Sequence, residues 1–148
     1  MGFPRAYRIP AVPASIEQLM RVPLFDGLGR KELQSLASSF KERTFKAGET
    51  LVSEGSGGIG FFIIDQGEAK VTLGGAERAR LKPGDYFGEL ALIDEGTRTA
   101  TITAETDMRC YGLTSWEFRP LVESNASIAW TMLQSLAKQL RQARTDSD

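Results

Sequence analysis

Hydrophobic and polar positions follow three patterns along the chain. Over 15–42 apolar residues recur every three or four positions, as in short amphipathic helices. Over 43–114 short runs rich in Val, Ile, Phe and Thr alternate with glycine-containing breaks, which is typical of strands joined by tight turns. Over 115–144 helical spacing returns. The pattern therefore predicts a mainly β domain, a sandwich or barrel, with helices at both ends.

Two different sequence signals predict the first and the last helix. Ser15 and Gln18 have the spacing of a capping box, which predicts a helix start at this point. Four apolar residues of the last helix fall every fourth position: Ile128, Met132, Leu136 and Leu140. This stripe must rest on the β domain, on the N-terminal helices or on a second subunit.

The two ends of the chain carry no helical or strand pattern. We expect a flexible N-terminal arm over 1–14, one domain over 15–144 and a short tail over 145–148. The arm has prolines and arginines but lacks the apolar core of a signal peptide. The longest apolar run, near 59–64, is far below the roughly 20 residues that cross a bilayer. We therefore expect no membrane interaction.

Composition removes several function classes. The chain has 148 residues and no His, which argues against imidazole bases, Ser/His/Asp arrangements and most metal sites. Lys plus Arg is 18 and Asp plus Glu is 19, so there is no basic surplus for nucleic acid. The single cysteine, Cys110, is expected to be a small buried hydrophobic residue, and its lack of a disulfide partner favours a reducing, cytoplasmic location. The two tryptophans, Trp116 and Trp130, are expected as core or interface anchors.

The segment LKPGDYFGELALIDEGTRTATI, residues 81–102, interrupts the strand pattern with a short helix. Its first residues end a strand in a turn, and 89–93 contains helix formers in place of alternation. Gly88 allows a ligand to approach the backbone closely. We expect a helix N-terminus at Gly88 and Glu89, where unpaired N–H groups would hold one anionic group of a small ligand.

Two charged side chains accompany that helix start. Arg98 follows a turn at Gly96 and is placed to fold back over the same spot, where its planar guanidinium suits a phosphate. A phosphate would repel the Glu89 carboxylate, whose natural partner is a neutral hydroxyl such as a ribose 2′-OH. The pair fits a sugar phosphate of low charge. An ion pair between the two residues on the rim of a sheet is the alternative.

This segment closely resembles the phosphate-binding cassette of the cyclic nucleotide-binding domain family. Further resemblance extends over most of the chain, from about residue 19 to about residue 140, in PLFDGL at 23–28, KAGETLVSEG at 46–55 and GFFIIDQGEAKV at 60–71. The resemblance implies a β-roll, a double-stranded β-helix or jelly roll. It has N-terminal helices over 15–42, strands over 43–114 with the cassette at 87–102, and C-terminal lid helices over 115–144. The implied ligand is cAMP or cGMP, with no cofactor and no metal.

The resemblance also implies roles around the phosphate and ribose. Glu89 would accept a hydrogen bond from the ribose 2′-OH, with the Gly88 backbone beside it, and Arg98 would pair with the cyclic phosphate. The backbone of three residues would complete the phosphate cradle: Leu90, Ala91 and Ala100.

Around the base, the resemblance implies contacts from three regions. Val71 would touch the base, and Leu140 or residues near Arg144 would cap it from the last helix. Thr99 would bond to the phosphate or to a guanine edge, although cAMP is the ligand that we expect. For Val71 and Leu140, ordinary core packing is the alternative.

The function that follows is a non-enzymatic cyclic-nucleotide sensor. It would signal by movement of its C-terminal helix, and the effector that receives the signal is not identified by the sequence. A homodimer through that helix is one arrangement for the apolar stripe. No second amphipathic unit or basic recognition helix follows, so we expect no nucleic-acid binding through this chain. Three alternatives stay open: a β-roll interaction module that no longer binds nucleotide, a regulatory domain cut from a larger transcription factor, kinase or channel, and a cupin-like enzyme, which normally needs His ligands.

Overall fold

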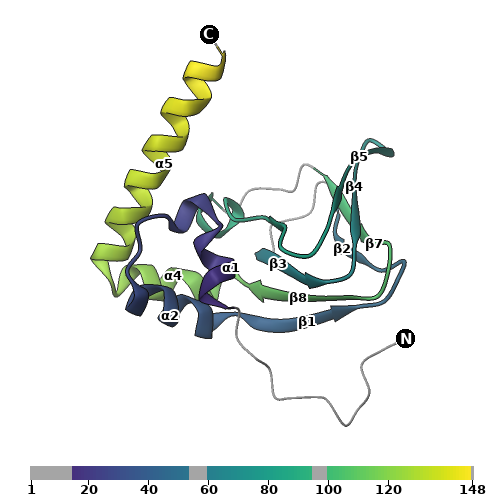
Figure 1. The fold of residues 1–148 in the computed structure, drawn as a ribbon, viewed down its shortest axis with the longest axis horizontal. Helices are drawn as coiled ribbons and strands as arrows, with labels where there is room; N and C mark the ends of the chain where they lie inside the picture. Colours follow the sequence, from purple (N-terminus) through teal and green to yellow (C-terminus); the bar gives the residue numbers. More distant parts are fainter. Residues whose placement is uncertain (1–14, 54–59, 95–99, 148) are drawn as a thin grey trace.

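The strands of this chain form two antiparallel sheets that face each other (Figure 1). The computed structural model describes residues 15–53, 60–94 and 100–147. One four-stranded sheet has the order β1-β8-β3-β6 and the other β2-β7-β4-β5. The strands are β1 (Lys41–Phe45), β2 (Thr50–Val52), β3 (Phe61–Gln66), β4 (Ala69–Leu73), β5 (Ala76–Leu81), β6 (Tyr86–Phe87), β7 (Thr101–Ala104) and β8 (Met108–Leu113). Apart from the β4–β5 hairpin, neighbours in each sheet are distant in sequence, so the strands wind back and forth as in a β-roll. The predicted fold class is confirmed.

Helices lie at both ends of the chain and inside the cassette segment. They are α1 (Ile16–Met20), η2 (Pro23–Phe25), α2 (Arg30–Ser39), α3 (Ala91–Asp94), α4 (Ser115–Glu123) and α5 (Ala126–Ser147). The predicted capping box is present, with the Gln18 N–H donating to Ser15 Oγ over 3.2 Å. Strand β1 begins at Lys41, two residues before the expected start of the β region.

Strand β3 explains why the longest apolar run of the chain belongs to a sheet. Successive side chains of a strand point to opposite faces. Phe61 and Ile63 therefore enter a core beneath the helices, whereas Phe62 and Ile64 enter a second core inside the roll. Both faces of this strand are buried, so the run shows no alternation.

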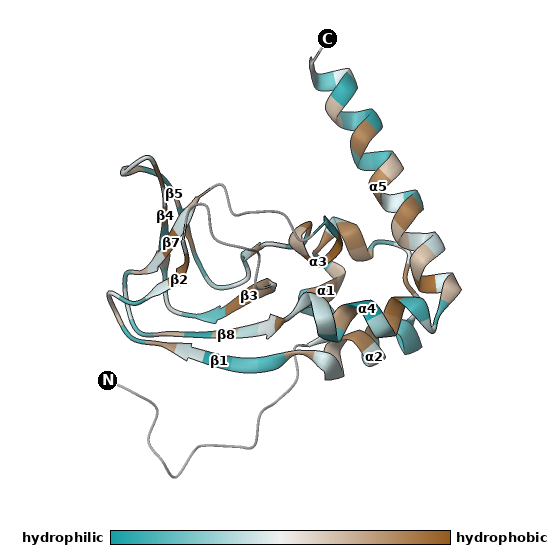
Figure 2. Cartoon of the chain, turned by 180° about the vertical axis from the view of Figure 1, so that it is seen from behind, coloured by the Kyte–Doolittle hydropathy of each residue, from teal (hydrophilic) through white to brown (hydrophobic). Residues whose placement is uncertain are grey.

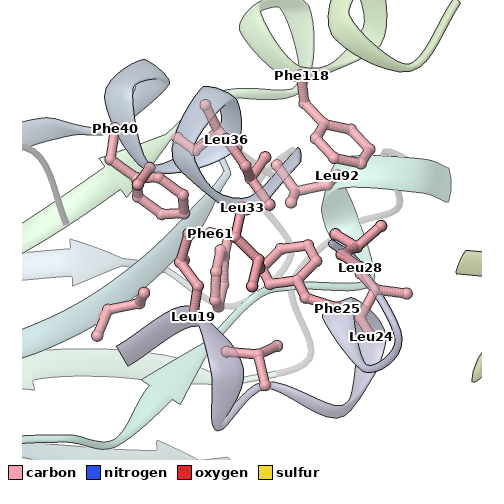
Figure 3. Packing of buried hydrophobic residues seen from close by; sticks show 14 of the residues in the cluster. Leu19, Leu24, Phe25, Leu28, Leu33, Leu36, Phe40, Phe61, Leu92 and Phe118 are labelled. Carbon is pink, nitrogen blue, oxygen red and sulfur yellow. The ribbon is translucent and has the colours of Figure 1, made fainter. Parts of the chain in front are cut away.

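The core beneath the helices joins the two ends of the chain (Figure 3). The Phe61 ring meets Phe25 and Phe40 edge-on, with centroids 5.8 and 5.6 Å apart. Leu92 from the cassette helix and Phe118 from α4 belong to the same cluster. The cassette helix is therefore packed against the helical part of the domain as well as attached to the roll.

The β3–β4 turn depends on a glycine. Gly67 has a φ of 91°, a left-handed conformation that side chains disfavour. A Cβ at this position would also overlap the Asp107 carbonyl oxygen. The turn thus lies directly against the loop before β8, where the Glu105 N–H donates to the Glu68 carbonyl over 2.9 Å.

Helix α5 has two halves with different surroundings. In the inner half, residues 126–136, Ile128 and Met132 are buried among the other helices. In the outer half, residues 137–147, every described side chain is exposed, and the helix leans away from the roll in Figures 1 and 2. The predicted stripe therefore rests on the N-terminal helices only over its first half.

Candidate functional site

The cassette segment turns sharply between β6 and α3. Gly88 has a φ of 86°, and the Ala91 and Leu92 N–H groups donate to the Gly88 and Glu89 carbonyls over 3.1 and 3.3 Å. Helix α3 therefore begins at Ala91, two residues later than the sequence predicts. Within the described ranges, the N–H groups of Glu89 and Leu90 donate to no other protein group. Two adjacent backbone N–H donors at such a turn are able to bind an anion.

Glu89 supplies the charged side chain of this turn. It is half-buried, and its carboxylate has no ion-pair partner among the residues that the structure describes. Burial and the nearby Glu89 charge both raise the pKa of the Tyr86 phenol. The expected phosphate partner Arg98 and its neighbour Thr99 lie outside the described residues.

Val71 lies on β4, and Ala100 directly precedes the neighbouring strand β7. Val71 pairs with Ile102 across β4 and β7, and Thr72 pairs with Thr101, which directly follows Ala100. Val71 is half-buried against the core inside the roll, and Ala100 is also half-buried. The structure thus brings together two of the residues expected at the two ends of a nucleotide.

The two apolar residues of α3 have different surroundings. Leu92 is buried in the core beneath the helices, whereas Ile93 is 47% exposed. The packing of α3 against α4 includes Leu92 and Phe118 (Figure 3). Helix α3 is therefore in direct contact with α4.

The expected lid residues belong to the outer half of α5, which leans away from the roll (Figures 1 and 2). Leu140 is 56% exposed on the outer half of α5, and Arg144 is also exposed there. Trp116 and Trp130, expected as core or interface anchors, are 65% and 63% exposed, so the core interpretation is wrong for both.

Helix α5 is held to the N-terminal helices by contacts that the sequence did not predict. The buried Ser135 hydroxyl donates to the Asp26 carbonyl over 3.0 Å. Near the start of α5, the Ser127 hydroxyl donates to Glu32 over 2.7 Å. The Gly29 N–H and then Ser127 hold the pKa of Glu32 below its usual value. No sequence signal joins these residues, because each bond links segments roughly a hundred positions apart.

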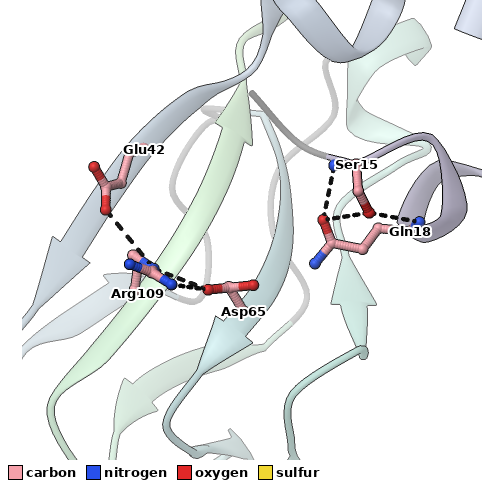
Figure 4. A network of polar contacts seen from close by, with 5 residues as sticks. All are labelled: Ser15, Gln18, Glu42, Asp65 and Arg109. Carbon is pink, nitrogen blue, oxygen red and sulfur yellow. Dashed lines mark hydrogen bonds and ion pairs between the residues drawn. The ribbon is translucent and has the colours of Figure 1, made fainter. Parts of the chain in front are cut away.

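A second group of charges lies on the first sheet and is satisfied internally (Figure 4). Arg109 on β8 stands between two acidic neighbours, Asp65 on β3 and Glu42 on β1. Its Nε donates to Asp65 over 2.8 Å and lies 3.7 Å from Glu42. These residues therefore tie three strands together and are not candidates for ligand binding.

Other kinds of site find little support. No cluster of metal-ligating side chains occurs in the part of the chain that the structure describes. Cys110 is fully buried as expected, and burial raises the pKa of its thiol to about 12. Among the described helices, none is long and apolar enough to cross a membrane.

Comparison with known proteins points to one family. Residues 42–125 match the model of the cyclic nucleotide-binding domain. The chain is 39% identical over 93 residues to the cAMP-dependent protein kinase regulatory subunit of Yarrowia lipolytica, across 62% of this chain and 25% of that protein. It is 32% identical over 131 residues to the cyclic AMP receptor protein of Thermus thermophilus, across 85% of this chain and 61% of that protein.

A solved structure supports the same assignment. The N-terminal domain of a transcriptional regulator from Streptomyces coelicolor has a TM-score of 0.80 and 29% identity, across 88% of this chain and 95% of that domain. The chain spans about a quarter of the kinase subunit and about three fifths of the receptor protein. The matched residues include the cassette, from β6 through β7, and make up more than half of the sequence. The chain therefore belongs to the cyclic nucleotide-binding domain family.

Proposed function

We propose that this chain is a non-enzymatic sensor domain that binds cAMP in the cassette. The observation that carries the proposal is the turn at Gly88. Two unbonded N–H donors lie there beside the half-buried Glu89 carboxylate, which has no cation partner in the described ranges. Donors next to a carboxylate suit a ligand that offers both an anion and a hydroxyl, as a cyclic nucleotide does. The cAMP-dependent kinase subunit and the cyclic AMP receptor protein support cAMP as the ligand.

In this proposal, two charged side chains and several backbone groups bind the ribose and the phosphate. Glu89 accepts a hydrogen bond from the ribose 2′-OH beside the Gly88 backbone, and Arg98 pairs with the cyclic phosphate. Backbone groups complete the cradle at Leu90, Ala91 and Ala100. The Ala91 N–H already donates to the Gly88 carbonyl. The backbone N–H groups of Glu89 and Leu90 therefore make more of the hydrogen bonds to the phosphate than the family pattern alone implies.

The base lies toward β4 in this proposal. Val71 contacts the base from the roll, close to Ala100 at the phosphate end. Thr99 bonds to the phosphate or, with cGMP, to the guanine edge. We expect cAMP to be preferred.

Signalling would run from the cassette to α5. The packing of Leu92 in the helical core supports a coupling between α3 and the helices, and the exposed outer half of α5 is the part with room to move. Nucleotide would favour a state in which this half closes over the base through Leu140 or Arg144. The energy of closure comes from the ligand's preference for that state.

The exposed face of α5 also suits a second copy of this chain. Trp130, Leu133, Ala137 and Leu140 are separated by three, four and three positions, the spacing of a coiled-coil seam. The three large residues are 56% to 63% exposed. A homodimer through this seam, an effector protein that receives the signal and a cytoplasmic location are parts of the proposal.

Equilibrium titration of the full chain with fluorescent cAMP, followed by displacement with cGMP and with 5′-AMP, tests the function. We expect saturable binding of one cAMP per chain, weaker binding of cGMP and much weaker binding of 5′-AMP, whose additional negative charge Glu89 would repel. Absence of saturable binding by either cyclic nucleotide would instead favour an interaction module without a nucleotide site.

A further inference from the structure

An apolar groove of about 340 Å³ lies between α3, α4 and α5. Its walls include Leu92 and Ile93 from α3, Phe118 and Val122 from α4, and Met132 and Leu133 from α5. The cassette turn at 88–90 does not line it. The volume falls at the small end of the range of about 300–1,000 Å³ that is usual for small-molecule sites.

One polar group inside this groove has no hydrogen-bond partner among the described residues. Ser115 lines the groove and is only 4% exposed. Its hydroxyl forms no hydrogen bond with any described residue, since the helix cap beside it is made by Thr114 and Glu117. A buried hydroxyl without a hydrogen bond is costly. A ligand that offers one hydrogen-bonding group would remove that cost.

The charges at the mouth of the groove neutralise each other. Arg119 Nε lies 3.1 Å from Glu123 Oε1, one turn apart on α4, and both side chains are mostly exposed. The interior is therefore apolar apart from Ser115, without a net charge to attract an ion. This favours a neutral ligand over an anionic or cationic one.

We propose that this groove is a second ligand site, separate from the cassette. Its ligand would be a small neutral apolar molecule that carries one hydroxyl, amine or carbonyl group for Ser115. This site does not depend on nucleotide binding, because its features are the apolar lining, the unpaired Ser115 hydroxyl and the neutral rim.

A fluorescence titration of the full chain with N-phenyl-1-naphthylamine tests the site, since this neutral amine brightens in apolar surroundings. We expect saturable binding of one probe per chain. Leu133→Asp places a charge on the groove wall and should weaken binding about tenfold or more. Leu140→Asp is the matched control: it lies on the same helix, 56% exposed against 57% for Leu133, and outside the lining. It should leave probe affinity within about twofold.

Displacement of the probe by two matched ligands tests the hydroxyl. In the wild type, 1-naphthol should displace the probe about threefold to tenfold better than 1-methylnaphthalene, because only the naphthol can bond to Ser115. Ser115→Ala should abolish that difference, with α4 still capped by Thr114.

Three results would overturn the proposal. Equal weakening by both leucine variants would put the probe on the open face of α5, where a second copy would also bind. Weakening by neither variant would put it elsewhere, for example in the nucleotide pocket. Equal displacement by the two naphthalenes would remove the role of Ser115. Because cAMP is titrated separately, a failure of nucleotide binding leaves the groove result interpretable.

Discussion

Deletion of residues 137–148 separates the proposed lid from the stability of the domain. The ion pair that links this segment to η2, between Lys138 Nζ and Asp26, spans 3.9 Å, and its side chains are 82% and 69% exposed. Such a pair contributes at most about 1 kcal/mol. The buried contacts of α5, including Met132 and Ser135, remain in the truncated chain. We therefore expect the free energy of unfolding to fall by no more than about 1 kcal/mol.

Nucleotide affinity should respond differently to the same deletion. Closure of the outer half would bury most of the exposed part of Leu140, which is worth about 1–2 kcal/mol, or fivefold to thirtyfold in affinity. Urea unfolding and cAMP titration of the truncated and intact chains measure the two effects. In the intact chain, amide exchange over 133–141 should also slow when cAMP is added.

A matched variant calibrates this experiment. Met132→Ala removes a side chain that is 4% exposed and should cost about 2–4 kcal/mol of unfolding free energy. If the deletion lowered the free energy of unfolding as much as Met132→Ala does, the outer half of α5 would have to be packed against the domain. If the deletion left cAMP affinity unchanged and cAMP left amide exchange in the intact chain unchanged, α5 would be a fixed support. The hypothesis that its outer half acts as a lid would then be wrong.

Three further changes probe single side chains. Glu89→Gln keeps one acceptor for the ribose hydroxyl, so calorimetry should report a loss of only about 1–2 kcal/mol in cAMP binding; a larger loss than that of Arg98→Ala would reverse the ranking. Thr99→Ala should weaken cGMP more than cAMP in competition titrations, and an equal loss would assign the hydroxyl to the phosphate alone. For Glu117, desolvation opposes ionisation, but Lys41 and Thr114 outweigh it and lower the pKa. The contribution of Glu117 to the free energy of unfolding is therefore fully present above the pKa that Glu117 has in the unfolded chain. It is lost as the pH falls through the lower pKa of the folded state. Urea unfolding of Glu117→Gln should show a weaker loss of stability toward acid pH, and parallel curves would contradict the assignment.

The order of elements and the cassette were predictable because their signals are local. The Ser15 capping box spans one turn, and the break in strand alternation at Gly88 lies within one short segment. Both depend on residues that are adjacent in sequence, so a single sequence suffices. The start of α3 was predicted two residues early, because a glycine in a left-handed turn precedes the first helical residue.

The partners of the helices were not predictable in the same way. Ile128 and Leu140 belong to one stripe, yet the first is buried and the second is 56% exposed. Periodicity reports which face of a helix is apolar and not how far the rest of the domain extends along it. The same reason applies to Trp130, whose exposure depends on where the N-terminal helices end. The unpaired hydroxyl of Ser115 had no signal in the sequence, because its lack of a partner depends on the packing of three helices.

Binding of a cyclic nucleotide through the cassette requires a partner for its phosphate, and the affinity of Arg98→Ala for cAMP measures that requirement. Arg119→Ala is the control, because it removes an exposed guanidinium from α4. Loss of the phosphate partner should cost about 3–5 kcal/mol, a decrease in affinity of hundreds-fold or more, with little change in the unfolding midpoint. The control should bind cAMP as the wild type does. An Arg98→Ala variant that folds and binds cAMP with unchanged affinity would mean that the nucleotide does not bind through the cassette.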